Sequence, residues 1–151
     1  MSTSISRECY TDDWQRTDPD YVVYLPETRV GSDGYADHFL VTSTPGGDLL
    51  ATWTMSGIEG SSDTRVVFAR SEDEGATWTE PQLLAGQEGG KGIACMFAFP
   101  VKNKAGRIYC YYNKDKGIYD GGFRVTAVLA CHVSDDDGRT WQETEIGRAH
   151  V

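Results

Sequence analysis

Charged side chains that could bind or act on a ligand gather in four glycine-rich segments of this 151-residue chain, over residues 31–37, 57–63, 85–92 and 115–122. Carboxylates can transfer protons, and guanidinium groups bind carboxylates in a bidentate manner. Loops held by a rigid scaffold commonly carry such groups, so a binding or catalytic site is expected here. Taken one at a time, each charge is better explained as a solvated loop residue. The residues are Asp33, Asp37, Glu59, Asp63, Glu88, Lys91, Asp115 and Asp120, with His38, Arg65 and Arg124 at neighbouring strand ends.

An eight-residue pattern, S-x-D-x-G-x-T-W, occurs twice, over residues 71–78 and 134–141, with starts 63 residues apart. Five fixed positions in the same order indicate a repeat architecture. Each position suits a tight turn between strands: the Asp accepts hydrogen bonds from turn N–H groups, the Gly adopts a positive φ, the hydroxyls close the flanks, and the Trp starts the next strand. The fixed residues are Ser71, Asp73, Gly75, Thr77 and Trp78, then Ser134, Asp136, Gly138, Thr140 and Trp141.

A calcium loop is the alternative for these acidic, glycine-containing runs. The EF-hand pattern places an Asp five residues before the Gly, and those positions hold Arg70 and Val133. The calcium interpretation is therefore disfavoured. No metal and no cofactor are expected.

The rest of the chain reads as short strands and turns. Eight segments rich in β-branched and aromatic residues are separated by Gly, Pro, Asp and Ser, and none shows a sustained 3.6-residue period. Four such strands make one propeller blade. Strands are predicted over 38–44, 49–56, 64–71 and 77–84, over 93–102, 107–114, 123–134 and 140–146, and as a lone strand over 21–25.

The order of these strands predicts where a site lies. In an antiparallel meander the connections alternate between the two ends of the sheet. The repeated turns join the third strand to the fourth, so they lie at the end opposite to the 57–63 loop. Asp73 and Asp136 are therefore predicted to be structural, and ligand-binding groups are predicted at the other end.

The two repeated runs resemble the Asp-boxes of sialidases and related BNR-repeat proteins. The resemblance implies an all-β fold: a partial β-propeller of two four-stranded antiparallel blades plus an N-terminal strand, from a six-bladed sialidase-like propeller. It extends over residues 38–84, with the P-G-G-D-L-L-A turn at 45–51 and the S-G-I-E-G loop at 56–60, and continues at F-P-V (99–101) and G-R-I-Y (106–109).

Sialidases of this fold use an arginine cluster for the substrate carboxylate, an Asp as general acid/base, and a Tyr activated by a Glu as nucleophile. By order along the chain, the resemblance implies Asp63 as the acid/base and Arg29 as the first arginine, although the Arg-Ile-Pro motif of well-characterised sialidases is absent. Glu59 resembles an acidic residue of sialidase-like BNR proteins and is predicted to support catalysis. Arg65 and His38 are predicted to bind substrate.

The implied function is the N-terminal part of a sialidase-like exo-glycosidase acting on sialic-acid-type sugars. The nucleophile and the remaining arginines belong to later blades, so the chain alone is expected to be inactive. The alternative is a non-catalytic Asp-box propeller module that binds carbohydrate or protein, since fold alone does not decide function. The predicted boundaries are an N-terminal segment over 1–36, a first blade over 37–90 and a second over 91–151.

Two blades leave two sheet faces without neighbours. In propellers, a strand such as 21–25 often joins the last blade and closes the ring. Residues such as Phe39, Val67 and Leu129 are expected on faces that bind the remainder of the propeller or other copies of the chain. Three copies would close a six-bladed ring, whereas open edges would lead to aggregation.

Composition limits the partners and the location. The net charge of −9 argues against nucleic acid and anionic membranes as partners. The N-terminus has no apolar segment typical of a signal peptide, and no run is long enough to span a membrane, so a cytoplasmic location is the default expectation. The cysteines at 9, 95, 110 and 131 lack C-x-x-C and zinc spacing. Buried free thiols are predicted for the last three, in preference to a cross-strand disulfide.

Overall fold

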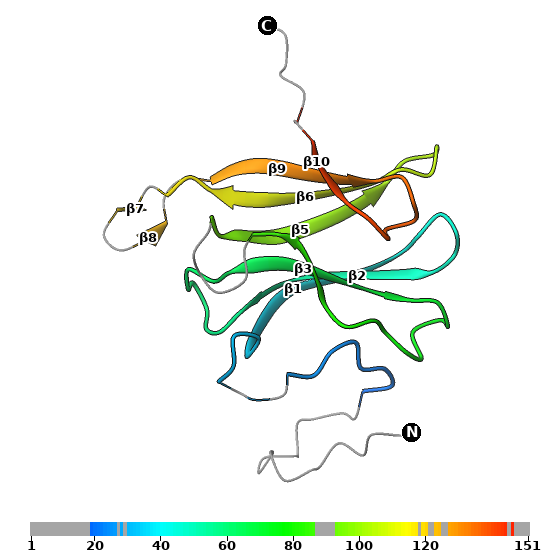
Figure 1. The fold of residues 1–151 in the computed structure, drawn as a ribbon, viewed down its shortest axis with the longest axis horizontal. Coiled ribbons are helices and arrows are strands. Elements are labelled where there is room, and N and C mark those ends of the chain that lie inside the picture. Colours follow the sequence, from blue (N-terminus) through cyan, green and yellow to red (C-terminus); the bar gives the residue numbers. More distant parts are fainter. Residues whose placement is uncertain are drawn as a thin grey trace, which may run out of the picture.

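The computed structural model describes residues 19–26, 28, 30–86, 93–117, 119–120, 123–124, 127–144 and 146, with 119–120 and 123–124 described by their backbone only. These residues form two four-stranded antiparallel sheets (Figure 1), which confirms the all-β prediction. None of them lies in a helix that is long and apolar enough to cross a membrane. The first sheet has the order β1 (Tyr35–Ser43), β2 (Leu49–Ser56), β3 (Arg65–Ser71), β4 (Gln82–Ala85). The second has the order β10 (Gln142–Thr144), β9 (Ala127–Ser134), β6 (Ile108–Asp115), β5 (Cys95–Lys102), and β7 (Tyr119–Asp120) pairs with β8 (Phe123–Arg124).

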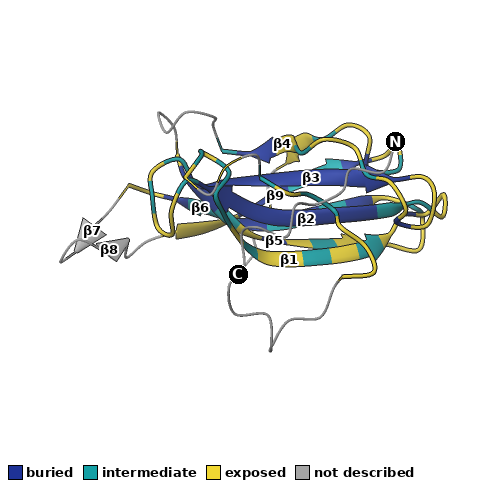
Figure 2. Cartoon of the chain, turned by 90° about the horizontal axis from the view of Figure 1, so that it is seen from below, coloured by how far each residue is buried: buried dark blue, intermediate teal, exposed yellow. Residues whose placement is uncertain are grey.

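The strands β2 and β3 form the buried centre of the first sheet (Figure 2). Their sequences, LLATWTMS and RVVFARS, are rich in β-branched and aromatic residues. Such residues suit strands that are covered on both faces. The edge strand β1 instead alternates between partly buried and exposed residues, so the first strand of the sheet is open to solvent along one side.

Several strands begin at other residues than the sequence predicts. The first strand starts at Tyr35, ahead of the predicted 38, and the predicted strand 123–134 is divided into β8 and β9. Both fourth strands start late: the turns engage Thr77 and Thr140, and regular pairing begins only at Gln82 and Gln142. Pro81 also has no N–H to contribute.

One apolar core joins the two sheets face to face. Trp141 contacts the Phe68 ring edge-on, with ring centroids 5.8 Å apart. Full burial of a side chain the size of Leu50 or Ile108 contributes roughly 1.5–3 kcal/mol, so this core is the main source of cohesion between the sheets. Its buried members are Leu50, Val66, Phe68, Leu84 and Ala85 from the first sheet, and Cys95, Ala98, Ile108, Cys110, Tyr112 and Ala130 from the second.

The opposite face of the first sheet carries a second apolar cluster, which the segment 19–26 covers. Val23 and Tyr24 pack against this cluster together with Trp78. The Tyr24 ring stacks on Trp53 with centroids 6.2 Å apart and an interplanar angle of 29°. The buried members are Ala51, Trp53, Met55, Val67 and Ala69.

Two expectations for this face are therefore wrong. The strand predicted over 21–25 is not formed, because none of the described strands pairs with these residues. Val67, expected on an open face, is only 3% exposed because the segment 19–26 covers its cluster. Phe39 and Leu129 are exposed as expected, at 50% and 58%.

The strand connections separate into two ends, as the meander predicts. In Figure 1 the β1–β2, β3–β4, β5–β6 and β9–β10 turns lie at the right, and the β2–β3 loop lies at the left with the β7–β8 hairpin. We call the first the turn end and the second the loop end. Both repeated S-x-D-x-G-x-T-W runs belong to the turn end.

Candidate functional site

The two S-x-D-x-G-x-T-W turns share the hydrogen bonds among their Ser, Asp, Gly and Thr residues, although only the first has a bond from its Trp, between Trp78 Nε1 and the Gly75 carbonyl. In the second, the Ser134 hydroxyl donates to Asp136 Oδ1 (2.8 Å) and accepts from the Gly138 N–H (2.9 Å). Thr140 donates its N–H to Oδ1 (2.8 Å) and its hydroxyl to Oδ2 (2.6 Å) of the same Asp136. The first turn repeats each bond within 0.1 Å between Ser71, Asp73, Gly75 and Thr77.

These bonds lower the pKa of both turn carboxyls. The hydroxyl and N–H of Thr140 hold the pKa of Asp136 at about 2, and Thr77 lowers the pKa of Asp73 in the same way. Both glycines have positive φ, 93° at Gly75 and 79° at Gly138. Each carboxyl is thus ionised and occupied by its own turn, which supports a structural role.

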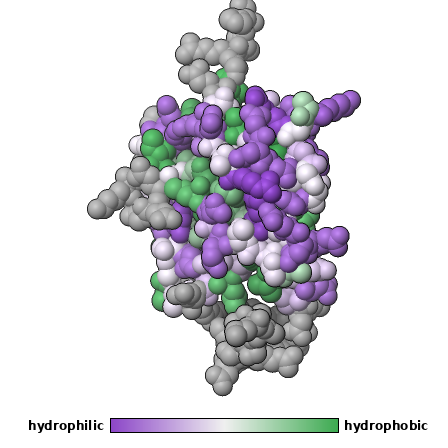
Figure 3. All heavy atoms as spheres, turned by 45° about the vertical axis from the view of Figure 1, so that its right-hand side comes forward, coloured by the Kyte–Doolittle hydropathy of each residue, from purple (hydrophilic) through white to green (hydrophobic). Residues whose placement is uncertain are grey.

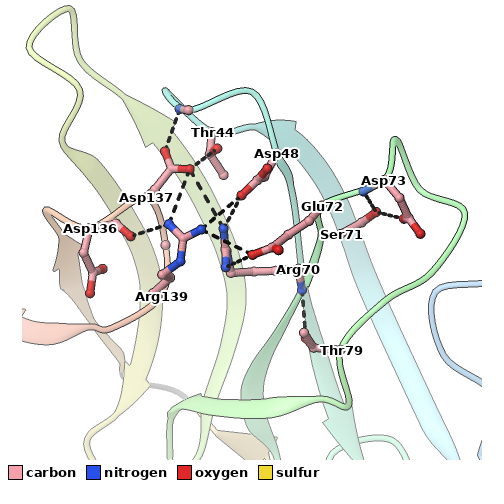
Figure 4. A network of polar contacts seen from close by, with 12 residues as sticks. Thr44, Asp48, Arg70, Ser71, Glu72, Asp73, Thr79, Asp136, Asp137 and Arg139 are labelled. Carbon is pink, nitrogen blue, oxygen red and sulfur yellow. Dashed lines mark hydrogen bonds and ion pairs between the residues drawn. The ribbon is translucent and has the colours of Figure 1, made fainter.

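A variable position of the second turn connects the two sheets (Figure 4). Asp137 has a positive φ of 66°, and its side chain points to the β1–β2 turn. Its Oδ2 accepts from the Thr44 hydroxyl and its Oδ1 from the Gly46 N–H, both at 2.7 Å. Burial opposes ionisation of Asp137, but these donors and nearby arginines keep its pKa below the ordinary value.

Two arginines complete this connection. Arg70 is only 7% exposed and forms ion pairs with Asp48 and, at 3.9 Å, with Asp137. Arg139 pairs with Glu72 at 3.3 Å and with Asp48 at 3.5 Å. Figure 3 shows hydrophilic residues gathered over much of this side of the molecule. Each charge of this group, Asp48, Arg70, Glu72, Asp137 and Arg139, has an opposite partner, and the group holds the two sheets together at the turn end.

Asp63 lies at the loop end, in the β2–β3 loop. Its Oδ2 accepts from the Gly57 N–H at 2.9 Å, and its Oδ1 accepts from the Ser61 hydroxyl. Burial raises the pKa of Asp63, but these hydrogen bonds outweigh burial, and the pKa lies below the ordinary value. Asp63 is therefore an ionised carboxylate that also shapes its loop.

Arg65 lies beside Asp63 and is 7% exposed. Its Nη1 donates to the carbonyls of Ser32 (3.1 Å) and Asp63 (3.3 Å), and its Nη2 lies 3.2 Å from Met55 Sδ. Arg65 also lines a cleft of about 670 Å³ between the first sheet and the N-terminal segment, which Asp33 and Glu80 border. The guanidinium is thus close to a cleft, with part of its hydrogen-bonding capacity used by the protein.

A second polar group follows at the start of β1. The Tyr35 hydroxyl donates to Asp37 Oδ2 at 3.2 Å. Burial, followed by the charge of Asp37 and its hydrogen bond, raises the pKa of Tyr35, and the charge of Glu59 adds to this. Asp37 Oδ1 is buried and has no hydrogen-bond partner among the described residues.

The structure groups the predicted site residues only in part. Asp63 and Arg65 are brought together, and Glu59 is close enough to Tyr35 to raise its pKa. His38 stands apart from these groups on β1, where its ring contacts Phe97 of the second sheet. Arg29 lies outside the described residues.

Sequence reasoning missed two of the residues described above, Tyr35 and Phe97. It named Asp37 but placed it in a loop, whereas Tyr35 and Asp37 both lie in β1. The positions of these residues depend on a bulge in β1 after Asp37 and on one in β5 before Phe99. Bulges of this kind leave little trace in a single sequence.

No group of three or more His, Cys, Asp or Glu side chains suited to a metal ion occurs within the described part of the chain. Cys95, Cys110 and Cys131 are buried free thiols, as predicted. Burial raises the pKa of Cys110 to about 12 and that of Cys95 to about 11. These thiols are therefore inert packing groups rather than nucleophiles.

Three solved structures share this arrangement of sheets. A Hadza microbial sialidase, Hz136, matches with a TM-score of 0.62 and 20% identity over 74% of this chain and 25% of its own. A protein of unknown function from Dyadobacter fermentans matches with a TM-score of 0.57 and 21% identity. The match covers 81% of this chain and 37% of that protein. Zg3597, a family 117 glycoside hydrolase from Zobellia galactanivorans, matches with a TM-score of 0.59 and 16% identity. The match covers 82% of this chain and 41% of that protein. A search of the curated proteins finds no match.

The fold defined by these sheets is that of a sialidase-type propeller, of which two blades are described. The chain belongs to the family of BNR repeat-like domains, whose model matches residues 47–150. The chain spans between a quarter and about two fifths of the solved structures it resembles.

Proposed function

We propose that this chain is the N-terminal part of a sialidase-like exo-glycosidase for acidic sugars, and that its loop end forms part of the substrate-binding surface. The observation that carries the proposal is the placement of an ionised carboxylate, Asp63, and a guanidinium, Arg65, which donates to the Asp63 main-chain carbonyl, at the loop end of a sialidase-type sheet pair. Family membership and the similarity to a sialidase and a glycoside hydrolase support it. The repeated turns are then Asp-boxes that hold the blades.

In this proposal each loop-end residue has a distinct part. Asp63 is the acid/base, and its pKa below the ordinary value means that it is ionised at neutral pH. Glu59 supports catalysis from the same loop. Arg65 and Arg29 attract the carboxylate of the substrate, and His38, which stands apart from them, contacts another part of the substrate. The nucleophile comes from later blades, so the chain binds but does not hydrolyse.

The test compares two ligands by saturation-transfer NMR. The first is N-acetylneuraminic acid, and the second is its 2,3-didehydro analogue, whose flattened ring resembles the oxocarbenium-like transition state. A glycosidase site binds the flattened ring more tightly than the ground-state sugar. We expect that preference here, with loss of both ligands in Arg65→Gln and no loss in Asp73→Asn at the turn end. A fluorogenic sialoside should not be turned over.

A non-catalytic module is the second candidate, because both oxygens of Asp63 already serve the loop. A module would bind the two ligands equally, or bind neither and recognise a protein instead. Turnover that Asp63→Asn abolishes would contradict both candidates as stated, because all catalytic groups would then lie within this chain.

A further inference from the structure

Two aromatic residues, His38 and Phe97, occupy equivalent places in the two sheets. His38 lies in β1 and Phe97 in β5, the first strand of each sheet. Both residues are near the start of their strand, which is at the loop end. Each also lies within a break in strand pairing, between Asp37 and Leu40 in β1 and between Met96 and Phe99 in β5. A bulge re-aims a side chain, and bulges are frequent beside binding sites.

The backbone at both positions is unusual. His38 has φ of 50° and Phe97 has φ of 61°. The other non-glycine residues with positive φ in the described part of the chain, Glu74 and Asp137, belong to the two repeated turns. For a bulky residue such as Phe, this conformation is a true outlier. Such conformations persist only where the surroundings impose them, and they concentrate at functional sites.

The surroundings of Phe97 do impose its position. Its N–H donates to Thr54 Oγ1 of β2 at 3.0 Å, which ties β5 to the first sheet. Its ring meets the His38 ring edge-on, with centroids 5.5 Å apart and an interplanar angle of 69°. Even so, His38 is exposed and Phe97 is 42% exposed. The pair is therefore rigidly held and accessible, which is unlike a side chain that merely fills a core.

The charge around this pair indicates which ligand it would accept. Asp37 precedes His38 and has a buried carboxylate oxygen with no partner among the described residues. Glu59 is exposed, and its charge reaches Tyr35 at the start of the same strand. Carboxylates at this place repel an acidic sugar but accept hydrogen bonds from hydroxyl groups. The electron-rich face of an aromatic ring attracts the weakly positive C–H groups of a sugar ring.

We propose that His38 and Phe97 form a subsite for an uncharged pyranose ring, with the apolar face of the sugar on Phe97 and its hydroxyls toward the exposed His38 imidazole. This subsite rests on the proposed function only in placing the ligand at the loop end. It adds a neutral sugar beside the acidic one, as a branched or extended glycan would present.

The test uses lactose, an uncharged pyranose disaccharide, and N-acetylneuraminic acid, an acidic monosaccharide, with the full chain. We expect lactose to bind and to shift the NMR signals of the His38 imidazole and the Phe97 ring. In Phe97→Leu, which keeps an apolar side chain but has no ring, lactose binding should weaken roughly tenfold. Phe97→Tyr, which keeps the ring, should stay within about twofold of the original affinity.

Phe99→Ala is the matched control, because Phe99 lies two residues further along β5 and is also exposed, at 55%. It should bind lactose normally. Failure of lactose to bind the unmodified chain, or equal weakening in Phe97→Leu and Phe99→Ala, would overturn the proposal. If Phe97→Leu does not fold, the proposal is tested by the unmodified chain alone: lactose must shift the NMR signals of the His38 and Phe97 rings, and the absence of these shifts would overturn it.

The two ligands also separate this proposal from the proposed function. Binding of N-acetylneuraminic acid without binding of lactose removes the neutral subsite and leaves the glycosidase proposal intact. Phe97-dependent binding of lactose without any binding of acidic sugar removes the acidic substrate and leaves the subsite intact.

Discussion

Asp137, in the β9–β10 turn, accepts a hydrogen bond from the Thr44 hydroxyl of the β1–β2 turn at 2.7 Å, although the two residues are 93 positions apart. The same carboxylate accepts from the Gly46 N–H. The contact therefore joins the second sheet to the first outside their shared apolar core. Its contribution can be measured against a natural control within the chain.

Asp137→Ala should lower the free energy of unfolding by about 1–3 kcal/mol more than Glu74→Ala does, because it strands the donors of Thr44 and Gly46. Glu74 occupies the same position in the first turn and has a similar positive φ, 59° against 66°. Both variants thus place Ala in the same strained backbone. Urea unfolding measures the difference, and equal losses would show that the contact between the sheets contributes nothing.

The pH dependence of stability should include a contribution from Asp136 between about pH 4 and pH 2. Its folded-state pKa of about 2 is below the ordinary value of 3.8, so its stabilisation is full above pH 4 and is lost as the pH falls through 2. The melting temperature of Asp136→Asn should be lower than that of the unmodified chain at pH 6, and the two should converge at pH 2. Glu74→Gln, at an exposed residue of the first turn, should leave the curve unchanged. A constant gap at every pH would contradict the assignment.

The two ends of the sheets should respond independently to substitution. Ser71→Ala removes the acceptor of the buried Gly75 N–H and should cost about 1–3 kcal/mol of stability. Sugar binding at the loop end should be unaffected in the folded protein, because the turn lies at the opposite end. Calorimetric titration with the ligands named above checks this, and a selective loss of binding would reverse the assignment of the ends.

Self-association should depend on the open face of the second sheet. Leu129 is 58% exposed there, beside the stacked rings of Tyr109 and Tyr111. Light scattering should show a trimer if copies close a six-bladed ring, or polydisperse aggregate if the edges stay open. Leu129→Lys should reduce either one, and Val30→Lys, at an isolated residue that is 93% exposed, should not. A soluble monomer would contradict both outcomes.

The buried thiols should react slowly in the native protein. In a Cys9→Ser variant, Cys95, Cys110 and Cys131 remain, all buried. Burial raises the pKa of Cys110 to about 12 and that of Cys95 to about 11, so very little thiolate is present at pH 8. Thiol titration with a disulfide reagent should proceed only as the protein unfolds. Rapid native reaction of any of the three would show that its strand opens readily.

The repeated turns explain why the fold could be predicted from the sequence. Ser71, Asp73, Gly75 and Thr77 act on one another within seven residues, so their identity alone determines the local structure. Strand boundaries were less predictable, because the start of β4 depends on the residue at which the hydrogen bonds of the turn end and on Pro81, which has no N–H. The segment 21–25 has the composition of a strand, yet it lies without a strand partner on the cluster around Trp53.

The candidate site was predicted less well, because part of it depends on contacts between residues that are far apart in the sequence. Asp63 and Arg65 are close in the sequence, so their proximity could be expected. The pairing of His38 with Phe97 depends on two separate bulges and on the packing of one sheet against another. No local pattern encodes a contact of that kind.

The two S-x-D-x-G-x-T-W turns share the hydrogen bonds among their Ser, Asp, Gly and Thr residues and have different residues between these positions. The fixed residues make any such turn, and the variable residues Asp137 and Arg139 contact particular residues of the neighbouring sheet. Glu74 and Ala76 stand at those variable positions in the first turn. The variable positions thus determine which neighbouring sheet a turn can contact. Exchanging the two turns would preserve both hairpins and remove the specific contacts between the two sheets.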